Sequence, residues 1–440
     1  MTVFDSHWRR YEPSSSMPWT LARAKHLYRR AGFGATWSEL KRSLQDGAQE
    51  SVSRMLAGRA RHYAVPEDFE DVSAIIRDAA VNSNDPERLK AWWLYRMLFT
   101  NDPLGEQLTL MWHNHFATSN LKVRSLSMMC EQNELFRRHS RGSFGELLQS
   151  VLHDRAMLSW LDADSNRKQH PNENLARELM ELFTLGVGKY TEKDVRESAR
   201  ALTGWSVKNG RTVLRMQHHD AGHKTVLGKQ GMLGLEDLTA ILIDEPATWK
   251  RLAWRLCDHF LGEGVPDEAI DALAVGLREH DLEIGWAVET ILRSEFFFRG
   301  SLHGSQVRSP VSHVVGTVRS LQLLDSPPST LRLAIWCARL GQDLFYPPNV
   351  GGWDGGRAWL TTRTIVARSN FAADLVQGRL WSPAERPRFH QLRQTLLEDH
   401  GSLAQLLLCE NEELKENTAP SADVGREIQS LLSQPNAFLN

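Results

Sequence analysis

Apolar positions recur at a helical spacing along most of this chain. Within 170–186, Leu175, Leu179 and Leu182 fall at i, i+4 and i+7, which places them on one face of a helix. At about 100° per residue, Glu178 falls on the buried side of the edge of that face. A buried acid costs stability unless a partner satisfies it, so we look for chemistry first in this segment.

Local signals indicate where helices begin and end. Pro171 suits the first turn of the 170–186 helix, and Gly186 is a typical residue to end it. Thr191 predicts the start of a second helix, with Asp194 reaching back as in a capping box. Another periodic stretch predicts one helix over 237–262. Cap signals of the same kinds also precede periodic segments at Thr36, Asp85 and Asp102.

One segment, 210–228, departs from helical periodicity and is rich in Thr, Val and His, so we expect a β-hairpin there. The predicted fold is therefore all-α: a single large multi-helix body with one short β-hairpin excursion and a helical C-terminal extension. We divide the chain into an N-terminal tail (1–17), an all-helical core (18–378) and the C-terminal extension (379–440).

Composition narrows the classes of function. The 440 residues are 41% hydrophobic, enough to bury one large core or two smaller ones. With 52 basic and 54 acidic residues, the net charge of −2 creates no field that favours nucleic acid or anionic membrane. No apolar run approaches the roughly 18 residues of a membrane span. Residues 1–16 lack the apolar region of a signal peptide, so the sequence as written predicts a cytoplasmic protein. The cysteines are widely spaced and read as reduced core residues: Cys130, Cys257, Cys337 and Cys409.

Carboxylates of the 170–186 helix are the candidate acid–base groups. Burial would raise the pKa of Glu178 toward working pH, as general acid–base catalysis requires. Glu173 takes this role if the helix is rotated. The structural alternative is that Glu178 is a buried acid paired with Arg200 or Arg30.

The stretch Trp112-His-Asn-His-Phe116 lies near a predicted helix end. His115 shares a face with Leu108 and Met111, so we expect it to be buried, whereas His113 points elsewhere. His115 is the candidate second acid–base group or a metal ligand. The alternative is a core histidine hydrogen-bonded to a carbonyl or carboxylate.

The predicted hairpin gathers histidines and an acid within a few positions. His219, Asp220 and His223 offer ligands for zinc or another divalent metal. The alternative is a polar, solvated loop.

A proline- and glycine-rich loop over 346–360 holds two tryptophans. Trp353 and Trp359, with Asp354 and Asn349 nearby, suit stacking on sugar rings, because such a ring has an apolar face and a polar edge. The alternative is that both tryptophans fill the core. We add Arg30 to these candidate substrate-binding residues.

Several stretches in the same order resemble a bacterial family known as domain of unknown function 1800; they are 27–36, 112–119, 170–205, 219–228, 308–311 and 341–356. The resemblance runs from about residue 22 to residue 371, and His223 is not part of the shared pattern. It implies no established activity. Members of the family often look exported and are often encoded beside a sulfatase-like family, which implies work on envelope material or a sulfatase-like partner.

Three functions fit these features. The first is a hydrolase- or lyase-type enzyme that acts on a saccharide or envelope polymer by carboxylate and histidine acid–base catalysis. The second is a non-catalytic partner or scaffold of a sulfatase-like protein, and the third is a metal-dependent enzyme. Convergence of Glu178, His115 and His219 around one cleft would favour the enzyme, and separate packed positions would favour the scaffold.

Overall fold

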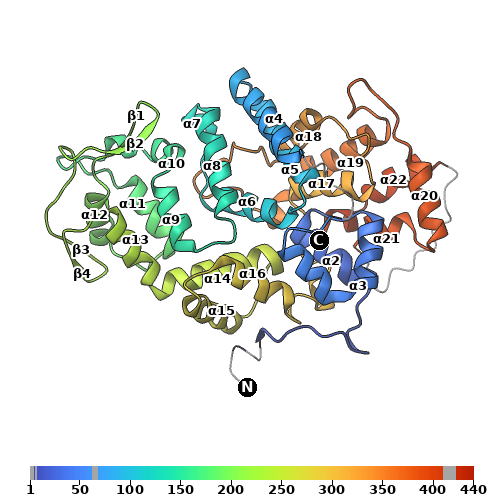
Figure 1. Cartoon of the computed structure of the whole chain (residues 1–440), viewed down its shortest axis with the longest axis horizontal. Helices are drawn as coiled ribbons and strands as arrows, with labels where there is room; N and C mark the ends of the chain where they lie inside the picture. The colour runs from blue at the N-terminus through green and yellow to red at the C-terminus, as the bar shows by residue number, and fades with distance from the viewer. Residues whose placement is uncertain (1–3, 5–6, 62–67, 410–422) are drawn as a thin grey trace.

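Helices form nearly all of the regular structure in the computed structural model, which describes residue 4 and residues 7–61, 68–409 and 423–440 (Figure 1). Across these ranges the other regular elements are two small two-stranded sheets. The predicted all-α class is thereby confirmed. Parts of the predicted N-terminal tail and C-terminal extension lie outside the described ranges.

The elements follow one another along the chain as α2 (Leu21–Gly32), α3 (Trp37–Leu56), α4 (Phe69–Ser83), α5 (Pro86–Phe99), α6 (Pro103–His115), α7 (Asn120–Val123), α8 (Leu126–Arg138), α9 (Phe144–Leu152), α10 (Arg155–Trp160), α11 (Asn174–Glu178) and α12 (Glu192–Ala201). The strands come next as β1 (Trp205–Lys208), β2 (Arg211–Leu214), β3 (Lys224–Val226) and β4 (Lys229–Gly231). The remaining α-helices are α13 (Leu235–Asp244), α14 (Pro246–Leu261), α15 (Asp267–Glu279), α16 (Ile284–Arg293), α17 (Pro310–Ser320), α18 (Thr330–Arg339), α19 (Thr362–Val376), α20 (Phe389–Glu398), α21 (Leu403–Leu407) and α22 (Val424–Leu432).

The β excursion consists of two hairpins where the sequence predicted one. β1 pairs with β2 and β3 with β4, both antiparallel. In the first hairpin, Asn209 and Gly210 have positive φ, as the central residues of a type I′ turn require. Leu227 and Gly228 do the same in the second. Gly210 therefore lies in a turn, and the excursion begins earlier than predicted.

Two predicted helices differ from the structure. The stretch 237–262 breaks into α13 and α14, because Pro246 has no N–H to continue the first helix and suits the first turn of the next. The 170–186 helix begins only at Asn174 and continues from Leu179 to Thr184 as a π-helix, η2. The capping box of Thr191 with Asp194 is confirmed.

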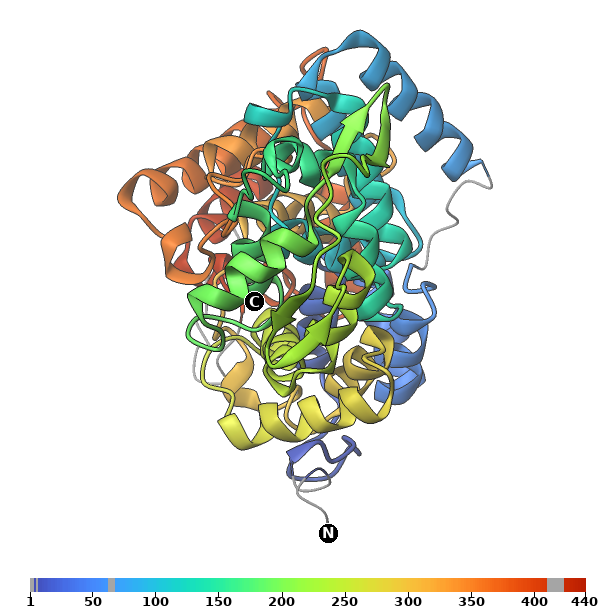
Figure 2. The ribbon, with the colours of Figure 1, turned by 90° about the vertical axis from the view of Figure 1, so that its left-hand side faces the viewer.

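Helices pack side by side both with their neighbours in the sequence and with helices far along the chain. α5 lies between α4 and α18, α15 packs along α14, and α22 packs against α19 and α21. The two hairpins lie on one face of the molecule, in front of the helices in Figure 2. The described part of the C-terminal extension therefore packs onto the helical body.

The core is rich in aromatic side chains. Trp92, Trp93 and Trp112 are the largest fully buried ones. The cysteines predicted to be reduced are free in the structure. Within the described ranges, no helix is both long enough and apolar enough to cross a membrane.

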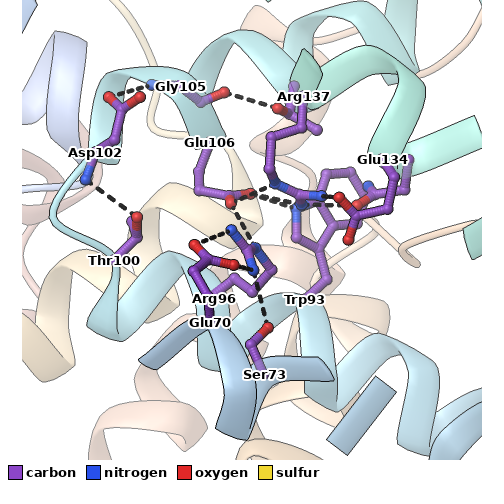
Figure 3. A network of polar contacts seen from close by, with 12 residues as sticks. Glu70, Ser73, Trp93, Arg96, Thr100, Asp102, Gly105, Glu106, Glu134 and Arg137 are labelled. Carbon is purple, nitrogen blue, oxygen red and sulfur yellow. Dashed lines mark hydrogen bonds and ion pairs between the residues drawn. The ribbon is translucent and has the colours of Figure 1, made fainter. Parts of the chain in front are cut away.

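A buried carboxylate joins helices α5, α6 and α8 (Figure 3). Glu106 of α6 is 1% exposed and accepts hydrogen bonds from Arg96 of α5 (3.0 Å), Arg137 of α8 (2.7 Å) and the indole of Trp93 (2.9 Å). Burial alone would raise the pKa of Glu106, but the guanidinium groups of Arg137 and Arg96 outweigh it and hold the pKa at about 2. Glu106 pairs with one arginine from each of two other helices, so the network fixes how α5, α6 and α8 pack.

We expect Glu106→Gln to lower the free energy of unfolding by about 3–5 kcal/mol, because it leaves two buried guanidinium groups without their shared carboxylate. Urea denaturation measures the loss. The matched control is Glu70→Gln, which removes an exposed carboxylate from the same Arg96 and should cost about 1 kcal/mol or less. Equal losses in the two variants would contradict the role of Glu106.

Candidate functional site

A cavity of about 660 Å³ opens between α2, α6, α14 and the 346–360 loop. Four of the predicted substrate-binding residues line it: Arg30, Trp353, Asp354 and Trp359. Asn349 does not, because its side chain accepts a hydrogen bond from the N–H of Gly351 (2.8 Å) within the loop. The structure thus brings together residues from α2 and the loop that are more than 300 positions apart in the sequence.

The two tryptophans form part of the cavity wall. Trp353 is 6% exposed and Trp359 is 7% exposed, so neither is an open surface platform. Neither belongs to the main apolar core cluster. Because both line the cavity, they offer aromatic surface to a ligand that enters it.

The histidine-rich end of α6 holds the loop in place. Asn114 accepts a hydrogen bond from the backbone N–H of Trp353 (2.7 Å) and donates one to its carbonyl (3.4 Å). Gly352 has φ +83°, and a Cβ there would lie 2.2 Å from Oδ1 of Asn114. Glycine is therefore required at this close approach. The 112–119 and 341–356 motifs are parts of one structural unit.

Both histidines of this motif are buried, so the expectation that His113 points away from the core is wrong. The rings of Trp93, Phe345 and Trp353 surround His113, and neither of its ring nitrogens has a hydrogen-bond partner in the described structure. Burial lowers the pKa of His113 to about 3. Its contacts are those of a neutral core residue.

His115 faces the π-helix and does not line the cavity. Its Nε2 lies 3.1 Å from the carbonyl oxygen of Phe183. Burial lowers its pKa, and the nearby charges of Arg255 and Arg251 lower it further. This arrangement matches the core-histidine alternative considered for His115.

The carboxylates of α11 lie outside the cavity. Glu178 is half-buried at the end of α11, directly before the π-helix, and has no hydrogen bond or ion pair in the described structure. Burial raises its pKa, and so does the neighbouring Glu181. Glu173 instead forms a partly exposed ion pair with Arg177 (3.0 Å).

Neither arginine proposed as the partner of Glu178 contacts it. Arg200 pairs with Asp220 (2.8 Å), and Arg30 donates to Gln306. The paired-acid interpretation of Glu178 is therefore wrong for both. The π-helix that follows adds a residue to the helical turn, a feature often found at functional sites.

The polar hairpin segment is organised around Arg200. The carboxylate of Asp220 and the backbone carbonyl of His223 (3.2 Å) both accept hydrogen bonds from Arg200. His219 Nδ1 lies 2.9 Å from the Thr203 carbonyl oxygen. Among the residues that the structure describes, no three His, Cys, Asp or Glu side chains are grouped as a metal site would require. The geometry therefore gives no support to a divalent metal at His219, Asp220 and His223.

The sequence analysis missed the α14 side of the cavity. Arg255, Asp258 and His259 line it. Burial raises the pKa of Asp258, which the nearby Arg255 partly offsets, and burial lowers the pKa of His259 to about 3. The available signal was the spacing of Arg251, Arg255 and Asp258 at i, i+4 and i+7, which places three charges on one face of a helix.

Gly352→Ala should lower the free energy of unfolding by about 1–3 kcal/mol, because it strains the backbone at positive φ and pushes Cβ against Asn114. The matched control is the adjacent Gly351→Ala, whose φ is not positive. Thermal unfolding of both variants measures the difference. A smaller loss of unfolding free energy in Gly352→Ala than in Gly351→Ala would contradict the close approach of Gly352 to Asn114.

His113 should make the protein less stable in acid. The folded protein keeps His113 neutral down to about pH 3, whereas the unfolded chain binds a proton near pH 6.5. Stability is therefore lost as the pH falls below 6.5, by about 1.4 kcal/mol per pH unit from this residue. In His113→Phe, the free energy of unfolding, measured by urea denaturation between pH 6 and pH 4, should change less steeply with pH than in the wild type, by about 1.4 kcal/mol per pH unit. An equal change in His170→Phe, at an exposed position, would contradict this assignment.

Comparison with known proteins confirms the resemblance of the motifs. A family model matches residues 26–437, which includes the region beyond the last shared motif. No curated protein and no solved structure matches the chain. The matching family is described as "Protein of unknown function (DUF1800)", and the chain belongs to it.

Proposed function

We propose that the cavity between α2, α6 and α14 is the active site of a hydrolase- or lyase-type enzyme that acts on a saccharide, free or within an envelope polymer. The observation behind this proposal is that one cavity combines two tryptophan walls with a partly buried carboxylate, Asp258, whose pKa burial raises. Aromatic walls suit a sugar ring, and a carboxyl group with a raised pKa suits general acid catalysis.

Asp258 takes the acid–base role in this proposal because Glu178, Glu173 and His115 do not line the cavity. As a general acid it gives its proton to the leaving oxygen while the C–O bond breaks. Glu263 and Asp354 also line the cavity and are the candidates for the second carboxylate. The cavity volume of about 660 Å³ is within the range of ligand sites in proteins.

A paired substitution tests this assignment. The wild type is screened on neutral and acidic polysaccharides, with release of reducing ends reporting hydrolysis and ultraviolet absorbance of a new C=C bond reporting elimination. Asp258→Asn should lower the rate on the substrate that the wild type turns over by about 100-fold or more, since the amide has no acidic proton to donate. Its folding is checked by circular dichroism.

Glu178→Gln is the discriminating variant, because Glu178 is the acid that the sequence predicted for this role and burial raises its pKa. Activity lost in Glu178→Gln and kept in Asp258→Asn would return the acid–base role to Glu178, at the π-helix. Loss in Asp258→Asn alone supports the cavity.

A non-catalytic partner or scaffold, of a sulfatase-like protein or another, is the second candidate. It is favoured by the positions of Glu178, His115 and His219, none of which lines the cavity. Saccharide binding in the cavity without turnover of any polysaccharide would select this function over the enzyme.

A further inference from the structure

Arg255 is a partly buried cation that forms no ion pair with any residue that the structure describes. It lies on α14 and lines the cavity, and its Nε is buried with no hydrogen-bond partner. No ion pair or hydrogen bond involves its guanidinium group in the described part of the chain. Asp258, one turn later on α14, is a carboxylate whose charge acts on it, and burial nevertheless lowers the pKa of Arg255 to about 10.

Two further nitrogen groups at the cavity lack acceptors. Arg30 is almost fully buried and donates to neutral groups, among them the Leu302 carbonyl (3.2 Å) and the Ser305 hydroxyl (3.0 Å), while its Nε has no partner. His259 Nε2 is also buried without a partner. The cavity is therefore lined by buried nitrogen atoms without a partner, and those of the two arginines are donors.

Some buried arginines of this protein are paired, whereas Arg308 and Arg368 keep nitrogen atoms without a partner but do not line the cavity. Arg319 pairs with the buried Glu39 (2.8 Å), and Arg96 pairs with Glu106. Arg29, which also lines the cavity, donates to the Leu407 carbonyl (2.8 Å). Arg255 differs from Arg308 and Arg368 because it lines a cavity, where a ligand that enters can supply the acceptor that the protein does not.

We infer that the cavity binds its ligand through an oxyanion, a carboxylate, sulfate or phosphate group, that lies between Arg255 and Arg30. Guanidinium groups bind such oxyanions with short, charge-assisted hydrogen bonds. We take the ligand to be an acidic saccharide, such as a uronate or a sulfated sugar. This identification of the ligand rests on the proposed function. The sugar ring then contacts Trp353 and Trp359 while its acidic group occupies the arginine end.

Isothermal titration calorimetry tests the inference with three probes: inorganic sulfate, D-glucuronate and neutral D-glucose. The wild type should bind at least one of the anions more tightly than glucose. Arg255→Gln should weaken that binding by about tenfold to a hundredfold, the range expected when a charge-assisted contact is lost. Binding of glucuronate but not sulfate assigns a uronate, and the reverse assigns a sulfate ester.

Arg251→Gln is the matched control. Arg251 lies one turn earlier on the same helix, also has a buried Nε without a partner, and does not line the cavity. This variant should bind the anion as the wild type does. Arg255→Lys keeps the charge without the planar fork and should weaken binding by less than Arg255→Gln, which allows a test if the glutamine variant does not fold. Equal weakening in Arg251→Gln and Arg255→Gln, or no anion binding by the wild type, would overturn the inference.

The two proposals fail separately. Binding is measured without turnover, so anion binding that depends on Arg255 in a protein inactive on every polysaccharide supports this inference and removes the enzyme. Turnover of a neutral polysaccharide that depends on Asp258, with no anion binding, supports the enzyme and removes this inference.

Discussion

The buried carboxylate of Glu106 is the constraint from which the rest of the architecture can be followed. An ionised acid inside the protein is tolerated only where cations are brought to it, and Arg96 and Arg137 come from two different helices to do so. Meeting that requirement sets the positions of α5 and α8 relative to α6. The apolar core alone is less directional, because hydrophobic burial does not specify which helix faces which.

The orientation of α6 then determines the cavity. Its N-terminal half carries Glu106, and its last turn carries Asn114, which holds the backbone of Trp353. Through that clamp the 346–360 loop lies against α6 with both tryptophans turned to the cavity. Without such an anchor, a loop of this length would not hold its tryptophans in one position at the cavity. The stability of the core and the shape of the candidate site are thus linked through one helix.

Charge is distributed unequally between core and cavity. Arg96 and Arg319 each meet a glutamate, whereas Arg255 and Arg30 at the cavity, like the buried Arg308 and Arg368, form no ion pair in the described part of the chain. The unmatched charge is costly in the free protein, and a bound oxyanion would remove that cost. Two guanidinium groups at one cavity favour an anionic ligand, which the size of the cavity alone does not specify.

Local patterns in the sequence were sufficient to predict the helical class and the caps, such as Thr191 with Asp194, because capping and amphipathic periodicity depend on residues a few positions apart. They also identified the 346–360 loop as a candidate site. They could not place Glu178, because the π-helix and the absence of an arginine partner depend on neighbouring helices. Nor did they single out Arg255, although its helical spacing with Arg251 and Asp258 is visible in the sequence. Only the tertiary structure showed that Arg255 and Arg30 line one cavity and that each keeps a buried Nε without a partner, since burial and hydrogen bonding depend on residues brought together from distant parts of the chain.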